Sequence, residues 1–268
     1  MHLNRSKVKI SARGGHGKKI KIVKEDIVPV IKTKTRTHKL KITKSHATGD
    51  IDGKKSYKEL SQWANLLGGH TAFILGNAPG VDKQNLSLLD DYFTIGVNRI
   101  FYIYDPTILI WQDRQVWQGD KKSLLKQKAI KVCESKADPK KYFLNFRAKT
   151  GPFRFGHDPA ILYGSGNTTA LAVQFAVSLG CSNIVLLGAD CKYGNNGKTD
   201  FYGKNKDHKP YTLKMCRGAM KWLKVFCPVT IYNCSGNDLW ETQSLYKVIK
   251  KLKPPQLNRE AYRKVFYK

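Results

Sequence analysis

The sequence predicts an α/β fold in which a mostly parallel sheet is covered by helices on both faces. From Tyr57 onward, apolar segments of strand length alternate with amphipathic segments of helix length, which favours parallel strands joined by helical crossovers. Two of the apolar segments run directly into glycine-bearing turns, Gly76-Asn77-Ala78-Pro79-Gly80 and Gly188-Ala189-Asp190. The first fifty residues instead alternate basic and apolar residues, which predicts a small basic β arm.

The expected elements follow one another in order along the chain. A first helix is expected over residues 57–67, because Gly68-Gly69 is a stop signal. Strands are expected over residues 71–75, 93–97, 107–111, 129–133, 142–146, 183–187 and 229–232. Further helices are expected near residues 83–89, 121–128, 168–179, 212–226 and 239–252. This pattern is Rossmann-like, and in such sheets ligands bind at the carboxyl ends of the strands.

The composition predicts three parts of unequal size. These are a basic β-hairpin or arm over residues 1–50, a Rossmann-like domain over 57–252, and a basic tail over 253–268 that is irregular after Pro254-Pro255. A disordered basic tail is the alternative for the arm, because little in it builds a core.

The net charge predicts a polyanionic partner. Lys and Arg number 48 against 20 Asp and Glu, a formal charge of +28. Nucleic acid, here DNA bound through its phosphates, is the first candidate; an anionic membrane surface and a merely lysine-rich proteome are the alternatives. The expected phosphate contacts are Lys19, Lys21, Lys39, Lys41, Arg147, Lys149, Arg154 and Lys204. Aromatic residues that either stack on a base or pack in the core are Trp111, Trp117, Tyr142, Phe146, Phe153 and Phe155.

The cysteines and the apolar segments point to a reduced, cytoplasmic protein without a membrane span. The six cysteines have no CxxC pair and no zinc-ligand spacing, so we expect them to be free and mostly buried. The start of the chain lacks an apolar signal-peptide region, and Asp105-Pro106 interrupts the most apolar run, residues 100–111.

The glycine-bearing turn at residues 76–80, which follows a strand, and a further glycine-bearing loop at residues 164–169, which opens a helix, predict a phosphate site. Residues 164–169, Gly-Ser-Gly-Asn-Thr-Thr, open an amphipathic helix, and the unpaired amides at a helix N-terminus stabilise an anion. Neither turn has GxGxxG spacing, and no GxxxxGK[ST] motif occurs. A tight connection without a ligand is therefore the alternative for each turn.

Four short motifs, in this order and spacing, resemble one family. They are Gly76-Asn77-Ala78-Pro79, Val97-Asn98-Arg99, Ser165-Gly166, and Leu187-Gly188-Ala189-Asp190 with Tyr193. Over about residues 71–245 they resemble the bacterial sialyltransferases that build lipooligosaccharide, and the related flagellin-glycosylation and pterin-diphosphokinase-like proteins of the same nucleotide-binding fold.

The resemblance implies a nucleotide-sugar donor, CMP- or UDP-linked, held by residues of these motifs. The implied contacts are Gly76, Asn77, Ala78, Pro79, Asn98, Arg99, Ser165, Gly166, Thr168, Asp190 and Tyr193. Tyr193 and Tyr202 are candidates for neutralising the leaving phosphate, and Gly80 stands where the family usually has serine. The alternatives are turn positions for Asn77 and Asn98 and a helix cap for Thr168.

The same resemblance suggests His208 as the catalytic base, because it lies about where the family keeps its catalytic histidine. Asp113, at the end of an expected strand, is the competing base. Asp190 is expected to bind a ribose or a divalent ion, or else to cap a turn. The resemblance implies that a DxD-bound metal is not strictly required, and no DxD motif follows a strand here, although Mg²⁺ is compatible with the site.

These observations lead to a first hypothesis: a glycosyltransferase that adds a sugar to a hydroxymethylated base of viral DNA. A sialyltransferase-like enzyme acting on a surface or lipid-linked glycan is the second. A non-catalytic protein that binds nucleic acid or sequesters nucleotides is the third. A pterin diphosphokinase is disfavoured, because the sequence offers no recognisable magnesium carboxylates.

Overall fold

The computed structural model describes residues 56–140, 142–149, 154–164, 166–205 and 208–267. The expected arm therefore lies outside the described residues, together with Lys19, Lys21, Lys39 and Lys41. Phe153 and Ser165 lie outside them as well.

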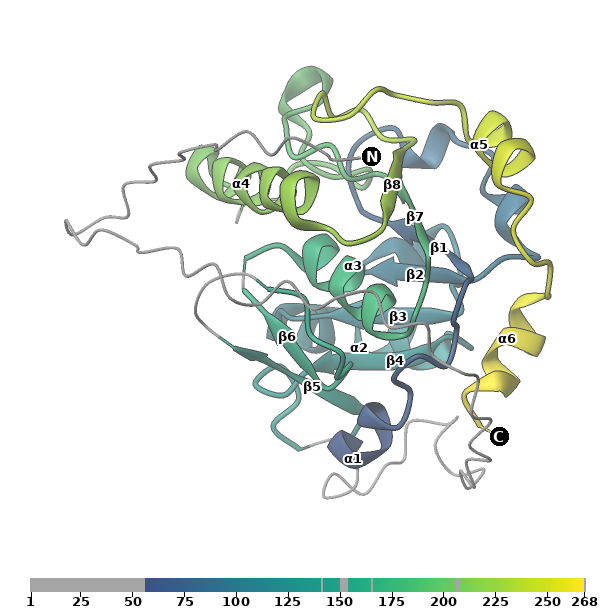
Figure 1. Ribbon diagram of the computed structural model, residues 1–268. Helices are drawn as coiled ribbons and strands as arrows, with labels where there is room; N and C mark the ends of the chain where they lie inside the picture. Colours follow the sequence, from purple (N-terminus) through teal and green to yellow (C-terminus); the bar gives the residue numbers. More distant parts are fainter. Residues whose placement is uncertain (1–55, 141, 150–153, 165, 206–207, 268) are drawn as a thin grey trace, which may run out of the picture. The chain divides into compact units, whose positions relative to one another are not determined.

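The described part of the chain is built on one eight-stranded parallel sheet with the order β6-β5-β4-β3-β2-β1-β7-β8 (Figure 1). Every neighbouring pair is parallel. This confirms the predicted α/β, Rossmann-like sheet. The strands are β1 (Thr71–Leu75), β2 (Thr94–Val97), β3 (Ile108–Trp111), β4 (Ile130–Glu134), β5 (Leu144–Lys149), β6 (Ile161–Tyr163), β7 (Asn183–Leu187) and β8 (Thr230–Asn233).

Helices cover both faces of this sheet, because the strands present apolar side chains on both sides. Along β1, Ala72 and Ile74 belong to one core cluster and Phe73 and Leu75 to the other. The first cluster includes residues of α1 (Ser56–Ser61), α3 (Thr168–Ser178), α4 (Pro210–Phe226) and α6 (Arg259–Val265). The second includes residues of α2 (Arg114–Lys126) and α5 (Leu245–Leu252), and of the 3-10 helices Val81–Lys83, Leu86–Leu89 and Ile100–Tyr102.

Several predicted helices have different bounds. The helix expected over 57–67 ends at Ser61 and continues as turns, and residues 83–89 form two 3-10 segments. The helix expected from residue 239 begins at Leu245, because Asn237 Oδ1 accepts from Leu239 N at 3.2 Å and holds this connection in a turn.

The expectation of an irregular C-terminal tail is wrong. Asn258 caps α6 by accepting from Ala261 N at 2.8 Å, and Tyr262 and Phe266 are fully buried in the core. The ring centroids of Trp63 and Phe266 are 4.6 Å apart. Tyr262 and Phe266 are four residues apart in the sequence, a spacing that places both on one face of a short helix.

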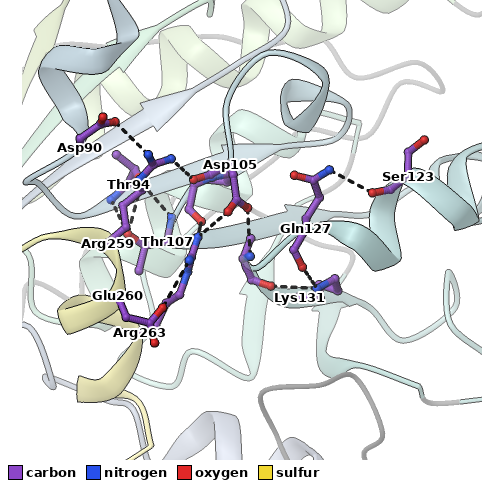
Figure 2. A network of polar contacts seen from close by, with 12 residues as sticks. Asp90, Thr94, Asp105, Thr107, Ser123, Gln127, Lys131, Arg259, Glu260 and Arg263 are labelled. Atoms are coloured by element: carbon purple, nitrogen blue, oxygen red, sulfur yellow. Dashed lines mark hydrogen bonds and ion pairs between the residues drawn. The ribbon is translucent and has the colours of Figure 1, made fainter.

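Arginines of α6 tie it to the turns that precede β2 and β3, as Figure 2 shows. Arg263 donates to Asp105 Oδ2 and to Pro106 O, both at 2.9 Å. Arg259 donates to Asp105 O at 2.6 Å and lies 3.1 Å from Asp90 Oδ1. This network fixes the amino ends of the strands.

The order of the strands changes direction beside β1. From β1 the chain moves outward to β6, and α3 then returns it to β7 on the other side of β1. The crevice at the carboxyl ends of β1 and β7 is therefore the place where a ligand is expected in an open parallel sheet. Among the described helices, none is long and apolar enough to cross a bilayer.

Candidate functional site

A polar cavity of about 490 Å³ opens at the carboxyl ends of β1, β2, β3 and β7. Nine of the predicted site residues line it: Asn77, Ala78, Asn98, Arg99, Asp113, Gly166, Thr168, Asp190 and His208. Its wall also includes residues that the sequence did not single out, among them Gln112, Asn167, Lys192, Asp200, Lys209 and Cys216. The volume is that of a small-molecule site.

The two glycine-bearing turns meet at the floor of this cavity. Gly76 N donates to Leu187 O at 2.7 Å, and Ala78 N donates to Gly188 O at 3.0 Å. A Cβ atom added to Gly76 would lie 2.1 Å from Gly188 O, so the two backbones touch where only glycine fits. The turns after β1 and β7 therefore form one continuous rim.

Asn77 and Asn98 follow neighbouring strands but use their side chains differently. Asn77 is buried, its Nδ2 donates to Val97 O at 2.8 Å, and its Oδ1 accepts from Arg99 N at 3.1 Å. Asn98 is in the left-handed region with φ 49°, and its backbone N donates to Ile110 O at 3.0 Å. Among the described residues, no donor reaches the buried Oδ1 of Asn98. Asn77 therefore braces the turn, whereas Asn98 lines the cavity with an Oδ1 that is buried and not hydrogen-bonded within the described residues.

A second loop closes the cavity at the start of α3. Asn167 caps this helix by accepting from Ala170 N at 3.1 Å, so the alternative that Thr168 is the cap is wrong. Gln112 Nε2 donates to Thr168 Oγ1 at 3.0 Å, and Gln112 Oε1 accepts from Gly166 N at 3.4 Å. One glutamine after β3 thus holds the predicted second donor loop.

Three helix N-termini border the cavity and direct backbone amides toward it. Asp113, Asn167 and Lys209 are the N-cap residues of α2, α3 and α4, and all three line the wall. The cations Arg99 and Lys192 line it too. Amides and cations in this arrangement favour a phosphate.

Arg99 belongs to a polar cluster with Asp120, Tyr102 and Tyr202. Its Nε donates to Asp120 Oδ2 at 2.6 Å, and its guanidinium lies 5.8 Å from the centre of the Tyr202 ring. Burial lowers the pKa of Arg99, but hydrogen bonds to Tyr202 and Asp120 outweigh it and leave the pKa raised. Burial raises the pKa of Tyr202 to about 12, helped by Asp200 and opposed by Arg99. At neutral pH the cluster therefore presents a fixed cation and a neutral phenol.

His208 lies beside a buried carboxylate that the sequence did not reveal. Its Nδ1 is 3.3 Å from Asp200 Oδ2, and the Asp200 side chain is only 4% exposed against 29% for His208. Asp113, the competing base, lines the same cavity from α2. Asp200 lies in a turn with no periodic pattern, so sequence reasoning had no signal for it.

Asp190 lines the cavity and also anchors a neighbouring loop. Its Oδ1 accepts from Gly236 N at 2.7 Å, and burial raises its pKa against the opposing effects of Gly236 and Lys192. The described residues hold no group of three or more His, Cys, Asp or Glu side chains that is able to bind a metal ion. The role of Asp190 toward a ribose stays a prediction.

Three predicted donor contacts lie just outside the cavity lining. Gly76 belongs to the turn after β1 but does not itself line the cavity. Pro79 packs against Gly194, because a Cβ added to Gly194 would lie 2.9 Å from Pro79 Cβ. The hydroxyl of Tyr193 donates to His208 O at 3.2 Å, so this side chain supports the loop that carries the histidine.

The predicted phosphate-contacting residues of the described chain are exposed, namely Arg147, Lys149, Arg154 and Lys204. Arg154 donates to the Tyr163 hydroxyl at 2.8 Å and lies 4.2 Å from the centre of its ring, and Lys149 Nζ is 6.0 Å from that centre. Tyr163 ends β6 and directly precedes the second donor loop. These three residues therefore form a cationic cluster beside the cavity's Gly166 side.

The stacking interpretation is wrong for two of the aromatic residues. Trp111 and Phe146 are fully buried in the core, where the strand pattern places them. Phe155 is partly buried and stacks on Trp222 with ring centroids 5.0 Å apart, and Trp117 and Tyr142 contact each other at 5.7 Å. All six cysteines are free, and three of them, Cys133, Cys181 and Cys234, are buried.

Comparison with known proteins gives little beyond this geometry. No protein-family model and no curated protein matches the chain. Among solved structures, the chain is similar to the sialyltransferase CstII from Campylobacter jejuni in complex with a substrate analogue, cytidine-5'-monophosphate. The identity is 14%, the match covers 68% of this chain and 84% of that one, and the TM-score is 0.38. A structural similarity of this size does not establish an activity.

Proposed function

We propose that this chain is a nucleotide-sugar-dependent glycosyltransferase. The observation that carries the proposal is one cavity that combines a phosphate-binding wall with a histidine beside a buried carboxylate. A phosphate-binding wall alone would suit a nucleotide-sequestering protein. The histidine adds the group that a transfer reaction to a hydroxyl requires.

The donor's phosphate is proposed to lie against the N-termini of α3 and α4. Thr168 and Thr169 line the cavity at the first of these, and Lys209 and Thr212 at the second. Arg99 and Lys192 supply further positive charge, so these cations stabilise the leaving phosphate. The Asn98 side chain, which lines the cavity and whose buried Oδ1 has no donor within the described residues, is proposed to contact the base or ribose. Titration with CMP and with UDP distinguishes the two nucleotides.

The reaction proposed is an inverting transfer. His208 takes the proton of the acceptor hydroxyl as its oxygen attacks the anomeric carbon. The bond between that carbon and the phosphate oxygen breaks, and its electron pair leaves with the nucleotide phosphate. Asp113 is the competing base, and substitution of each residue separates the two assignments.

The acceptor is proposed to be a hydroxymethylated base of viral DNA. The net charge of +28 and the cationic cluster of Lys149, Arg154 and Tyr163 beside the second donor loop support an anionic acceptor. A sialyltransferase-like enzyme that modifies a surface or lipid-linked glycan is the alternative acceptor class. A non-catalytic nucleic-acid-binding or nucleotide-sequestering protein is the alternative without transfer.

The donor site is tested by titrating the full chain with CMP, UDP, CMP-sialic acid and UDP-glucose. We expect one nucleotide to bind, and Lys192→Ala and Lys209→Ala to weaken it. The exposed Lys221 on α4, which does not line the cavity, gives the matched control Lys221→Ala with unchanged affinity. Failure of every nucleotide to bind at millimolar concentration would overturn the donor site.

The transfer is tested with radiolabelled donors and three acceptors: hydroxymethylated DNA, unmodified DNA and lipooligosaccharide. Label in hydroxymethylated DNA alone supports the first acceptor class, and label in the glycan supports the alternative. Assays with and without EDTA show whether Mg²⁺ is needed. Nucleotide binding without hydrolysis or transfer to any acceptor would leave only the sequestering protein.

A further inference from the structure

We propose that Asp200 is the positioning residue for His208: its carboxylate selects the ring tautomer and stabilises the protonated ring. The inference rests on the proposed function of the cavity for its kinetic consequence, but its structural content is testable alone. The Asp200 carboxylate is buried. Asp200 is 3% exposed as a residue, and a carboxylate removed from water is costly unless it is paired or hydrogen-bonded.

The partners of Asp200 point to His208. Within the described residues, the basic group at ion-pair distance from Asp200 is His208, with Nδ1 and Oδ2 3.3 Å apart. Thr199 Oγ1 donates to the same Oδ2 at 3.0 Å. The hydroxyl thus fixes the carboxylate that faces the imidazole ring.

The backbone around Asp200 is fixed as well. Asp200 N donates to Gly203 O, and Gly203 N donates back to Asp200 O, both at 3.0 Å. The next residue, Phe201, donates its N–H to Asn77 O at 2.8 Å. This contact ties the Asp200 turn to the glycine-bearing turn after β1, so the carboxylate is placed relative to the donor site.

The histidine is held from its backbone. His208 N donates to Asn205 O at 3.1 Å, and His208 O accepts from the Tyr193 hydroxyl at 3.2 Å. Its Nδ1 is buried and lies at ion-pair distance from Asp200 Oδ2 without forming a hydrogen bond to it in this geometry, although the side chain as a whole is 29% exposed and lines the cavity. We assign the contact with a substrate to Nε2, because Nδ1 is turned toward Asp200.

This geometry defines the proton path. With the neutral ring protonated on Nδ1 toward Asp200, Nε2 carries the lone pair. The acceptor hydroxyl transfers its proton to Nε2 while its oxygen bonds to the anomeric carbon and the nucleotide phosphate departs with the bond's electrons. The imidazolium that forms lies against the Asp200 carboxylate, which stabilises its charge.

Other titratable groups share the cavity wall but differ in their charge. Burial raises the pKa of Cys216 to about 11 and of Tyr202 to about 12, so both are neutral at pH 7. The cavity wall also holds the ionisable groups Asp113 at the N-cap of α2, Asp190 after β7, Arg99, Lys192 and Lys209. Asp200 is the carboxylate at 3.3 Å, so its removal is expected to dominate any change at His208.

The pair is tested first without any activity measurement, by NMR of the full chain labelled on its histidine rings. His208→Gln identifies the His208 signals among the seven histidines. In the wild type we expect the neutral ring to be the Nδ1–H tautomer. In Asp200→Asn we expect the pKa of His208 to fall by about one unit, as for loss of an opposite charge at this distance. The amide spectrum of the same sample shows whether the variant is folded.

The matched control is Asp138→Asn, which replaces a buried aspartate in the β4–β5 connection that does not line the cavity. It is expected to leave the His208 pKa unchanged. An Nε2–H tautomer in the wild type, or a His208 pKa that differs by less than about 0.2 units in folded Asp200→Asn, would overturn the proposal.

The kinetic test uses the donor and acceptor found for the wild type. We expect Asp200→Asn to lower kcat by roughly 10- to 100-fold with little change in the donor KM, and the double variant with His208→Gln to be no slower than His208→Gln alone. If the kcat of the double variant were lowered by the product of the two single effects, Asp200 and His208 would act independently and the proposal would be overturned. If no transfer is found with any substrate while the NMR results hold, the proposed function fails and the Asp200–His208 pair stands.

Discussion

Asn77 and Asn98 make opposite predictions for substitution, although both are asparagines at neighbouring strand ends. Asn77→Ala removes two hydrogen bonds that brace the turn, Nδ2 to Val97 O and Arg99 N to Oδ1, and is expected to cost about 2 kcal/mol of stability. Asn98→Gly keeps the left-handed backbone at φ 49° and removes a side chain that lines the cavity and makes no bracing hydrogen bond through its Oδ1. We expect roughly five- to tenfold weaker nucleotide binding with unchanged stability.

The measurement is a pair of thermal melts and nucleotide titrations on both variants. Nucleotide affinity that falls equally in the two variants, with equal melting temperatures, would contradict the division between a bracing and a ligand-facing asparagine.

Lys131 makes a prediction about pH. Burial lowers its pKa from 10.5 to about 8, opposed by Asp105 and assisted by Arg263, and its Nζ donates to Gln127 O at 2.6 Å (Figure 2). The unfolded chain binds this proton more tightly, so between about pH 8 and 10.5 unfolding takes up a proton and this residue's contribution to stability rises with pH. At pH 7 the charged amine is a cost.

Lys131→Met removes that cost. Its melting temperature relative to the wild type is expected to be highest at pH 7 and to decline by roughly 6–12 °C by pH 10.5, because a pKa lowered from 10.5 to about 8 corresponds to about 3 kcal/mol. The comparison with the wild type cancels the common effect of the other lysines. A difference that stays constant across this range would show that the Lys131 pKa is not lowered by folding.

At the scale of elements, the contact between the turns after β1 and β7 is decisive for the site. Gly76→Ala would place a Cβ 2.1 Å from Gly188 O, and backbone on both sides cannot move aside cheaply. We expect a loss of about 3 kcal/mol or more and loss of nucleotide binding, measured by denaturant unfolding and titration.

The matched control is Gly218→Ala within α4. An added Cβ there meets no atom within 4 Å, and alanine favours a helix by roughly 0.5–1 kcal/mol over glycine. A Gly76→Ala variant that is as stable as the wild type would show that the two turns do not meet as described.

The same elements explain how much of the structure the sequence could predict. Residues 71–75 and 183–187 form strands with the predicted bounds, because each is a continuous apolar run that ends at glycine. The strand β6 is three residues long and α6 seven, too short for a periodic signal. Asp200 was missed because its role depends on Gly203 and on Asn77, and contact between such distant segments has no local pattern.

At the scale of the whole molecule, the amino ends and the carboxyl ends of the strands differ in how their charged side chains are used. At the amino ends, Arg259 forms an ion pair with Asp90, and Arg263 forms one with Asp105. At the carboxyl ends, helix N-termini and lysines face an open cavity. We predict that a polyanion would bind on the side where the proposed chemistry takes place, near the exposed cations Lys149 and Arg154.

This arrangement predicts a specific salt dependence for DNA binding. The logarithm of the binding constant should fall linearly with the logarithm of salt concentration, because Lys and Arg release counterions from phosphates. If Lys149 and Arg154 each contact one phosphate, the double variant Lys149→Ala/Arg154→Ala should reduce the slope by about two. The exposed Lys264 of α6, whose helix is tied to the amino ends of the strands, provides Lys264→Ala as a control with an unchanged slope.

The outcome also decides between acceptor classes. A nucleic-acid acceptor requires the phosphates to reach the cluster beside Tyr163 while the target hydroxyl reaches His208, so loss of the slope and loss of transfer to DNA should go together. A double variant that binds DNA with the wild-type slope but no longer labels a glycan acceptor would mean that the cluster recognises an anionic sugar. The basic surface would then serve the glycan, and DNA binding would be a non-specific consequence of the charge.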